Sequence, residues 1–382
     1  MDFNTYISEK KSINIEKIKT IFIDKLNGII SSESNDSPIL SMVLNAINTS
    51  KGSTLSSRYG QNDNICFSES ELIDAYQQDE KWLEYLIYRF SFKYYPKNKI
   101  LPPFPMVIAV EAASRCNLRC KMCFQRNMDT ITPKVNNGIM SKEVYLKFLS
   151  QIVEKKLYSI VFASRGEPLL NPRIDWMIKQ AKERGVLDIK LNTNATLLNE
   201  AVGRRLLESG LDLIVFSIDS VNPNTYKKIR GYELEKVLNN IDRFLSIKEK
   251  YYPNSKLKTR VSMVVSNDLE ERDKEIEMAR TYWINRVDEF SVKTENDFIT
   301  IYDNDDICKH RVACGLLWER LYVWYDGTVN PCDIDHRSFL ELGNILSDDL
   351  YHIWHGKKMQ GYRKKHIEGE NLGKPCINCC GY

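Results

Sequence analysis

The sequence predicts an α/β protein built around a parallel sheet, and two features of the chain predict it. From Met106 onward, short runs rich in β-branched and apolar residues alternate with segments in which apolar residues recur at helical spacing. Gly185 and Gly210 stand where two of these helices are expected to end, because glycine is favoured just past a helix C-terminus. Strands separated by helices form parallel βαβ units, so we expect an α/β sheet or barrel.

Six strand–helix units are expected in this part of the chain, fewer than the eight of a complete (β/α)8 barrel. We expect strands at 106–112, 158–164, 188–194, 211–219, 259–266 and 287–293. We expect helices around 142–155, 173–184, 199–209, 234–250 and 268–284. In parallel α/β folds the functional loops follow the carboxyl ends of the strands, so the loops after these strands are where chemistry is expected.

The two ends of the chain have a different pattern. Residues 1–100 are polar and weakly patterned, with expected loops at 31–38 and 49–64 and an amphipathic helix at 68–95. The prolines of "YYPKNKILPPFP" mark the end of this helical extension. Near the other end, "RLYVWYDGTVNPC" predicts a β-hairpin that turns at Asp326-Gly327, and "SDDLYHIWHG" predicts a short capped helix.

Composition excludes several classes of partner. Hydrophobic residues make up 43% and charged residues 27% of the 382 residues, which is ordinary for a soluble globular protein. The net charge of +3, from 54 basic and 51 acidic residues, favours neither nucleic acid nor a membrane surface as a partner. The N-terminus lacks the apolar core of a signal peptide, so we expect a cytoplasmic protein. Disulfides are rare in that compartment, and clustered cysteines there are more often metal ligands or catalytic groups.

The strongest chemical signal is "CNLRCKMC", in which Cys116, Cys120 and Cys123 follow the first predicted strand at the spacing C-x3-C-x2-C. One interpretation is a structural zinc completed by a distant ligand, although zinc motifs favour paired C-x2-C units. The other is a [4Fe–4S] cluster with three cysteine-bound irons and a fourth iron open to a ligand that is not protein.

This motif resembles the signature of the radical S-adenosylmethionine (SAM) superfamily, and neighbouring segments from about 105 to 295 extend the resemblance. "SRGEP" (164–168) is similar to the family's GGEP segment, with Arg165 in place of the first glycine. "LNTNAT", "FSIDS" and "IRG" follow the next strands. The resemblance implies a partial (β/α)6 TIM-like barrel, in which SAM binds the open iron and the cluster cleaves it reductively to a 5′-deoxyadenosyl radical. It implies that SAM is bound by Gly166, Glu167, Pro168, Asn192, Asn194, Ser217, Asp219 and Arg230.

A second cysteine group lies in the last quarter of the chain. Cys314, Cys332, Cys376 and Cys379 include one C-x2-C pair and would suit either a zinc ion or a second cluster. The segment resembles the SPASM/twitch auxiliary domain, with the spacing of the single-cluster dehydrogenase of butirosin biosynthesis, and this implies one auxiliary [4Fe–4S] cluster. Cys308 could replace one of the four as a ligand. Cys380 is not expected to bind the same cluster, because it is directly adjacent to Cys379. Cys66 is expected to be a free or buried thiol.

Together these features predict an N-terminal helical extension (1–100), a radical SAM core (101–300) and an auxiliary cluster domain (301–382). The expected activity is hydrogen abstraction from a small molecule, such as a sugar or alcohol oxidised in polysaccharide or secondary-metabolite biosynthesis, with an electron donor such as flavodoxin or ferredoxin. The alternatives are modification of a ribosomal peptide, for which residues 1–100 lack the usual leader-binding pattern, and a non-catalytic iron–sulfur electron carrier. An oxidation would need a base, and the candidates are Arg165, Lys293, Glu295 and Tyr302.

Overall fold

The computed structural model describes residues 3–7, 14–32, 38–50, 65–126, 138–266, 271–295, 301–302, 313–370 and 372–379. Its ten strands form one sheet with the spatial order β1-β7-β6-β5-β4-β3-β2-β8-β9-β10. The strands are β1 (Phe3–Ile7), β2 (Val107–Val110), β3 (Ser159–Phe162), β4 (Asp188–Thr193), β5 (Leu213–Ser217), β6 (Lys258–Val265), β7 (Glu289–Thr294), β8 (Arg320–Val323), β9 (Thr328–Asn330) and β10 (Gly343–Asn344).

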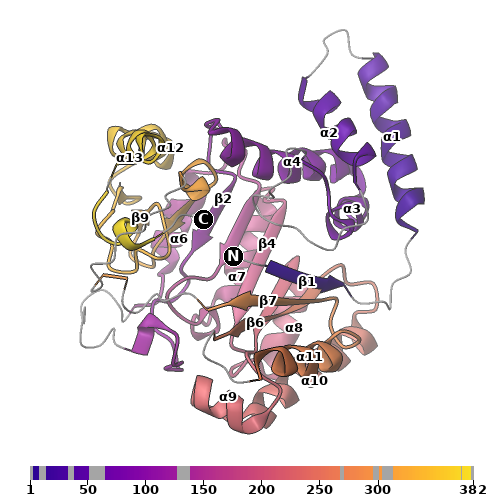
Figure 1. Cartoon of the computed structure of the whole chain (residues 1–382), viewed down its shortest axis with the longest axis vertical. Helices are drawn as coiled ribbons and strands as arrows, with labels where there is room; N and C mark the ends of the chain where they lie inside the picture. Colours follow the sequence, from indigo (N-terminus) through magenta and orange to yellow (C-terminus); the bar gives the residue numbers. More distant parts are fainter. Residues whose placement is uncertain are drawn as a thin grey trace.

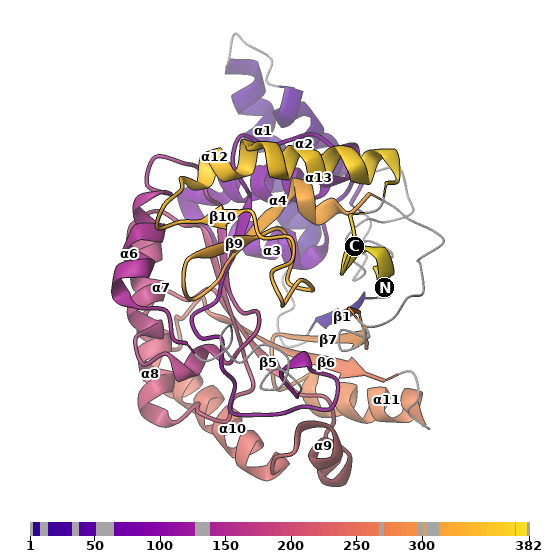
Figure 2. The same cartoon turned by 90° about the vertical axis from the view of Figure 1, so that its left-hand side faces the viewer.

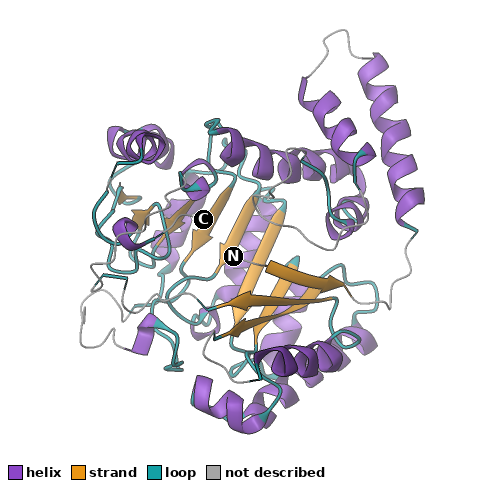
Figure 3. Cartoon of the chain, in the orientation of Figure 1, coloured by secondary structure: helices purple, strands orange, loops and turns teal. Residues whose placement is uncertain are grey.

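Strands β2 to β7 form the partial barrel that the sequence predicts. They are parallel and neighbours in sequence order, with pairs such as Val107↔Ser159 and Arg260↔Glu289. Helices follow them on the outer side of the sheet (Figure 1, Figure 3). These helices are α6 (Lys142–Ser150), α7 (Ile174–Glu183), α8 (Glu200–Glu208), α9 (Pro223–Arg230), α10 (Leu234–Tyr251) and α11 (Arg272–Trp283). The six expected strands and five expected helices are confirmed, and α9 is an addition.

Both edges of this six-stranded sheet are covered by segments from the ends of the chain. On one side β1 pairs antiparallel with β7, in the register Phe3↔Lys293 to Ile7↔Glu289. On the other side β8 pairs parallel with β2, and the predicted hairpin continues the sheet through β9, with Gly327 in the turn at φ +87°. Sequence analysis expected neither edge pairing. Because exposed strand edges favour association with other chains, these two segments give the open barrel covered edges.

The N-terminal extension is a helical layer of four helices, α1 (Ile15–Ser32), α2 (Pro38–Asn48), α3 (Glu69–Tyr76) and α4 (Trp82–Asn98). The helix expected at 68–95 is divided into α3 and α4, and α1 and α2 were not expected. Ser68 and Glu71 form a capping box that begins α3. The layer has its own apolar core, in which the rings of Phe22 and Trp82 stack at 5.1 Å. Most of the loop predicted at 49–64 lies outside the described residues.

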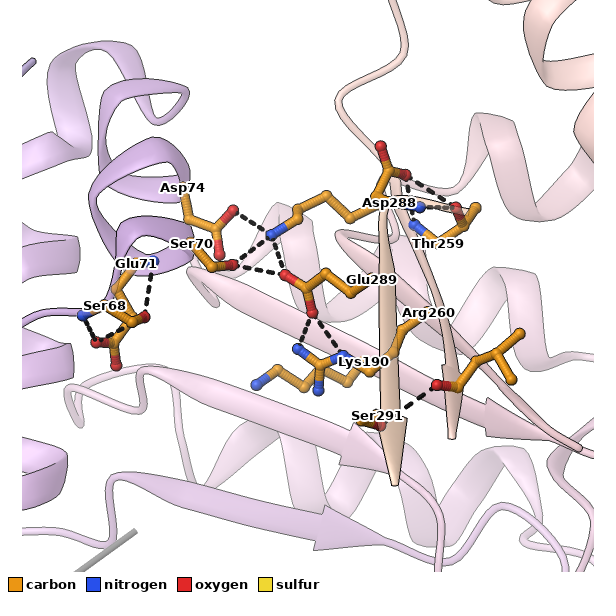
Figure 4. A network of polar contacts seen from close by, with 12 residues as sticks. Ser68, Ser70, Glu71, Asp74, Lys190, Thr259, Arg260, Asp288, Glu289 and Ser291 are labelled. Carbon is orange, nitrogen blue, oxygen red and sulfur yellow. Dashed lines mark hydrogen bonds and ion pairs between the residues drawn. The ribbon is translucent and has the colours of Figure 1, made fainter. Parts of the chain in front are cut away.

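Helices α3 and α4 lie against the amino ends of the barrel strands and form a polar floor (Figure 4). Lys258, the first residue of β6, contacts Asp74 of α3 at 2.7 Å and Glu289 of β7 at 2.6 Å. Ser70 donates a hydrogen bond to the same Glu289 carboxylate at 2.5 Å. We call these contacts, with the Arg260–Glu289, Glu71–Arg89 and Asp188–Lys190 pairs, the floor network. The barrel is therefore covered at the end opposite the predicted functional loops.

The C-terminal unit consists of the hairpin and the helices α12 (Leu350–His355) and α13 (Lys357–Glu368). Helix α12 has the predicted cap, with Asp349 accepting from two backbone N–H groups, and it ends at Gly356 as expected. Trp354 donates to the carbonyl of Pro102 at 2.9 Å, so α12 is attached to the segment that leads into β2. Figures 1 and 2 show α12 and α13 toward the same end of the molecule as the N-terminal helices. In the described residues, no helix is both long and apolar enough to cross a membrane.

Glu71 in the floor network gives a testable stability prediction. Burial acts to raise the pKa of Glu71, but the charges of Lys93 and Arg89 outweigh it and lower the pKa to about 2. A carboxyl group with a lowered pKa stabilises the fold above its unfolded pKa, and this stability is lost as the pH falls toward 2. We expect Glu71→Gln to lower the free energy of unfolding at pH 7 by about 3 kcal/mol, from the size of the pKa shift.

Urea unfolding measured at a series of pH values checks this. The difference between wild type and Glu71→Gln should shrink below about pH 4.5, the ordinary pKa of a glutamate side chain. Glu277→Gln, which removes an exposed pair with Arg280, serves as the control and should leave the unfolding midpoint unchanged. A constant difference across the pH range would contradict the assignment of the stability to the Glu71 charge.

Candidate active site

The three clustered cysteines lie on the loop that follows β2, and N–H groups point at two of their sulfur atoms. The backbone N–H of Leu118 donates to Cys116 Sγ at 3.5 Å, and that of Gln125 donates to Cys123 Sγ at 3.4 Å. The Asn194 amide, from the loop after β4, lies 3.8 Å from Cys116 Sγ. Hydrogen bonds to sulfur are how proteins adjust iron–sulfur clusters, so the donors around this loop fit a sulfur-bound metal centre.

Burial raises the pKa of all three thiols, to about 11 for Cys116 and about 12 for Cys123, while Cys120 is shifted in the same direction. The mutual charges of the cysteines add to this for Cys116 and Cys123, which means that the three side chains are close together. Thiolates are the metal-binding form, and a bound cationic centre would stabilise the thiolates that burial disfavours. In the described residues, no group of three or more His, Cys, Asp or Glu side chains is arranged to hold a single metal ion.

Gly166, in the loop after β3, is required because backbone from the cysteine loop lies directly against it. A Cβ atom at this position would be 2.2 Å from the carbonyl oxygen of Ala113 and 2.4 Å from that of Arg115. The next residue, Glu167, donates its backbone N–H to the Arg115 carbonyl at 3.0 Å. Glycine is therefore the only residue that lets these two loops touch.

Glu167 joins the loop after β3 to the end of β4. Its carboxylate accepts hydrogen bonds from the Thr193 hydroxyl at 2.7 Å, the Asn194 backbone N–H at 2.8 Å and the Leu169 backbone N–H at 3.1 Å. Burial raises the pKa of Glu167 although these donors act in the opposite direction. A cationic group beside the carboxylate would stabilise its ionised form, so the site fits an ammonium partner. Pro168 begins a short 3-10 turn, Pro168–Leu170, directly after it.

The remaining predicted SAM residues lie around the same loop. The Asn194 amide also donates to Asn117 Oδ1 at 2.9 Å, while Asn192 lines the barrel interior. Asp219 accepts a hydrogen bond from Arg230 Nε at 2.6 Å, and Arg230 also bonds the Cys120 side chain. Ser217 is the last residue of β5 and is partly exposed. Three successive strand ends thus meet the cysteine loop, as the sequence analysis expected of a site at the carboxyl edge.

Arg165 is buried in an ion pair that joins the barrel to the C-terminal unit. Its guanidinium contacts both oxygens of Glu111, at 2.6 and 2.7 Å, and lies 4.4 Å from the centre of the Trp324 ring. The two charged side chains are 1% and 0% exposed. Since Glu111 follows β2 and Trp324 follows β8, the contact holds the hairpin against the barrel strands.

A stacked pair of rings connects the two cysteine groups. Phe124, which follows Cys123, stacks on His336 with the ring centres 4.2 Å apart and the planes inclined by 6°. His336 is 1% exposed and lies four positions after Cys332 in the C-terminal unit. Sequence analysis did not predict this contact. The aromatic residue directly after the third cysteine was a feature of the sequence that could have suggested it.

Cys314, Cys332, Cys376 and Cys379 line one pocket in the C-terminal unit, together with apolar residues, Tyr362 and His366. Burial raises the pKa of Cys332, and the charges of the other three cysteines add to this effect. Four thiols within electrostatic reach of one another in a common pocket fit a fully cysteine-bound centre. Cys308 and Cys380 lie outside the described residues, and Cys66 is a partly buried free thiol.

Of the four residues suggested as a base, Lys293 is the one that lines the barrel cavity. Tyr302 is 2% exposed and donates its hydroxyl hydrogen to Asp335 at 2.7 Å within the C-terminal unit. The backbone of Glu295 continues β7 by donating to the Val265 carbonyl at 2.8 Å. The side chains of Arg165 and Tyr302 are therefore held by other partners, Glu111 and Asp335.

The cavity inside the barrel has a volume of about 600 Å³ and reaches from the floor network to Ser164 and Asn192 at the cysteine-loop end. Charged side chains enter it at alternate positions of the strands, among them Lys190 of β4, Arg260 of β6 and Lys293 of β7. Sequence analysis did not identify Lys190 or Arg260. Strands of a parallel sheet are usually apolar throughout, so charged residues at alternate positions of β4 and β6 were the signal in the sequence that could have identified them.

Comparison with known families agrees with this geometry. The model of the radical SAM superfamily matches residues 110–277, and the model of the SPASM iron–sulfur cluster-binding domain matches residues 314–380. The chain therefore combines a radical SAM domain with a SPASM domain. The cofactors of these domains are [4Fe–4S] clusters and SAM.

Individual proteins show more distant similarity. The peptide-bound structure of SuiB from Streptococcus suis has a TM-score of 0.56 at 15% identity and covers 78% of this chain and 75% of that chain. The anSMEcpe structure with bound AdoMet has a TM-score of 0.54 at 17% identity, over 72% and 86% of the two chains. BtrN in complex with AdoMet and 2-DOIA is 20% identical over 70% of this chain and 88% of that chain, with a TM-score of 0.47. At these identities, the similarity to SuiB and to anSMEcpe supports the fold alone.

Two curated relatives differ in the extent of the match. The cofactor-modifying protein of tungsten-containing aldehyde ferredoxin oxidoreductase from Pyrococcus furiosus is 38% identical over 112 residues, which is 29% of this chain and 30% of the relative. The probable GTP 3′,8-cyclase of Methanocaldococcus jannaschii is 24% identical over 59% of this chain and 84% of the relative. The first match thus spans less than a third of the relative's length.

The contact at Gly166 predicts a local effect on metal loading. Gly166→Ala should displace the cysteine loop, because its new Cβ has no space against the backbone of residues 113–115. We expect the reconstituted variant to lose the iron of the barrel cluster, about half of the total, while the C-terminal centre stays loaded. Iron analysis measures this, with Gly361→Ala as the control, because nothing lies within 4 Å of a Cβ in that helix. Full iron content in Gly166→Ala would contradict the steric argument.

The buried ion pair predicts a strong effect on stability. Arg165→Met leaves the Glu111 carboxylate buried without its cation, which costs about 3–5 kcal/mol of unfolding free energy. The double variant Glu111→Leu/Arg165→Met removes both charges and should recover much of that loss. Denaturant unfolding of both variants measures the difference. A double variant as unstable as Arg165→Met alone would show that the charge is not the cause.

Proposed function

We propose that this protein is a radical SAM enzyme that cleaves SAM reductively and abstracts a hydrogen atom from a small-molecule substrate. The observation that carries the proposal is that Glu167, Asn194 and Arg230, from loops that follow three successive strands, all contact the loop that carries Cys116, Cys120 and Cys123. A cysteine-bound cluster with SAM supplies the electron and the 5′-deoxyadenosyl radical when both are bound. The protein supplies binding, orientation and protection from side reactions.

The chain's own residues have distinct parts in this proposal. Cys116, Cys120 and Cys123 hold the cluster, and Cys314, Cys332, Cys376 and Cys379 hold the auxiliary cluster. Glu167 binds the amino group of SAM with its buried carboxylate, and Arg230, oriented by Asp219, binds the SAM carboxylate. Gly166 and Pro168 shape the loop that carries Glu167, while Asn192, Asn194 and Ser217 border the nucleoside.

The cavity favours a small molecule over a peptide. Its volume of about 600 Å³ lies within the usual range of small-molecule sites, and helices α3 and α4 cover it at the floor. The substrate class we propose is a sugar or alcohol oxidised in polysaccharide or secondary-metabolite biosynthesis, with Lys293 as the candidate base. The curated relatives are named for a GTP cyclase and a cofactor-modifying protein, so the common core supports several reactions and the substrate site decides among them. Ribosomal-peptide modification remains the alternative, since SuiB was solved with its precursor peptide.

Cys314, Cys332, Cys376 and Cys379 would hold the auxiliary cluster, which would supply an acceptor for one electron in the oxidation of the substrate. The stack of Phe124 on His336 keeps the loops of both cysteine groups in contact, which suits transfer between them. The electron that starts each turnover is proposed to come from a flavodoxin or ferredoxin.

The changes Cys116→Ala, Cys120→Ala and Cys123→Ala together test the proposal. We expect about eight irons per wild-type chain and about four in the triple variant, which should form no 5′-deoxyadenosine from SAM and dithionite. The matched control is Cys314→Ala/Cys332→Ala, which should lose the auxiliary iron and still cleave SAM. Formation of 5′-deoxyadenosine by the triple variant would refute the assignment of the catalytic cluster.

A further inference from the structure

In two ion pairs of the floor network the cation is more exposed than its carboxylate partner. The Glu289 side chain is 1% and the Asp188 side chain 7% exposed. Their partners Arg260 and Lys190 are 25% and 26% exposed, and all four residues line the cavity. At these two pairs a ligand in the cavity would therefore meet mainly the guanidinium and the ammonium groups.

Two carboxylates pair with three cations around Lys190. The Asp188 carboxylate lies 3.3 Å from the Lys190 ammonium, whereas the single Glu289 carboxylate pairs with both Lys258 and Arg260. Burial lowers the pKa of Lys190; Asp188 opposes this, and the charges of Arg89 and Arg260 lower the pKa further. Figure 4 shows the Lys190 and Arg260 side chains extending into the same space from neighbouring parts of the wall. An anion placed between them would relieve the mutual repulsion of these cations.

The cavity has space for such an anion and for the molecule that carries it. Small side chains, Ala109 and Ser262 among them, form part of the wall around the two cations. Asn192 lies two positions along β4 from Lys190, so its Cα is about 7 Å nearer the cysteine loop, given the rise of a strand. Asn194 lies a further two positions along and contacts Cys116 Sγ. A sugar-sized molecule is long enough to extend from the cations toward that end.

We propose that Lys190 and Arg260 bind an oxyanion of the substrate, a phosphate or a carboxylate group, and so orient its reacting carbon toward the cysteine loop. Guanidinium and ammonium groups are the usual protein partners of both anions, and Arg offers two parallel N–H donors. The identification of this ligand as a substrate rests on the proposed function, while the anion site itself does not. The substrate class is thereby narrowed to small molecules that carry a negative charge.

The test uses the full reconstituted chain and two probes, inorganic phosphate and acetate, each compared with chloride at equal ionic strength. A ligand that binds the folded state raises the melting temperature, and the concentration dependence gives its affinity. We expect wild type to bind one of the two probes, and the probe that binds shows whether the site takes a phosphate or a carboxylate. We expect Lys190→Gln to bind that probe at least tenfold more weakly. Lys190→Arg keeps the charge and should retain binding. Lys182→Gln is the matched control, because Lys182 also pairs with a carboxylate, is 25% exposed and lies outside the cavity lining.

Ser262→Asp is a second variant that leaves every ion pair of the floor network in place. It adds a negative charge to the cavity wall and should also abolish binding, which keeps the test valid if Lys190→Gln unfolds. Binding of neither probe by wild type, or binding by Lys190→Gln and Ser262→Asp that is as tight as that of wild type, would overturn the anion site. If phosphate or acetate binds and wild type forms no 5′-deoxyadenosine, the proposed function fails and the anion site stands.

Discussion

The contact between Gly166 and the backbone of residues 113–115 is the constraint on which the geometry of the site depends. It lets the loop after β3 lie against the loop after β2, and it brings the Glu167 N–H to the Arg115 carbonyl at 3.0 Å. The Glu167 carboxylate then reaches Thr193 and Asn194 at the end of β4. One missing Cβ atom therefore allows three strand ends to meet beside the cysteines.

Buried charge organises the rest of the molecule around this point. The Arg165–Glu111 pair holds the C-terminal hairpin against the barrel, and the Phe124–His336 stack keeps the two cysteine loops together. At the other end, the floor network attaches α3 and α4 to the amino ends of the strands. Because buried charges are costly unless they are paired, these networks specify how the three parts of the chain fit together. They also leave a cavity that faces the cysteine loop.

Local patterns predicted the elements of the barrel well. The alternation of strand and helix periods placed the six parallel strands, and turn chemistry placed the hairpin at Asp326-Gly327. Helices α1 and α2 were missed because their polar surroundings masked the apolar positions that pack against α3 and α4. Of the residues predicted to bind SAM, Gly166, Glu167, Asn194 and Arg230 contact the cysteine loop. Arg165 and Tyr302 were chosen by their position near strand ends, and their side chains bond to Glu111 and Asp335.

The sequence by itself determined the order of the elements and the spacing of both cysteine groups, because each depends only on the order of residues along the chain. Only the tertiary structure decided that β1 and β8 cover the edges of the barrel, since each pairs with a strand more than 200 residues away. It also decided that Arg260 and Lys190 are more exposed to the cavity than their partners Glu289 and Asp188. That choice depends on α3 and α4 packing against β6 and β7, and no local pattern records such a contact.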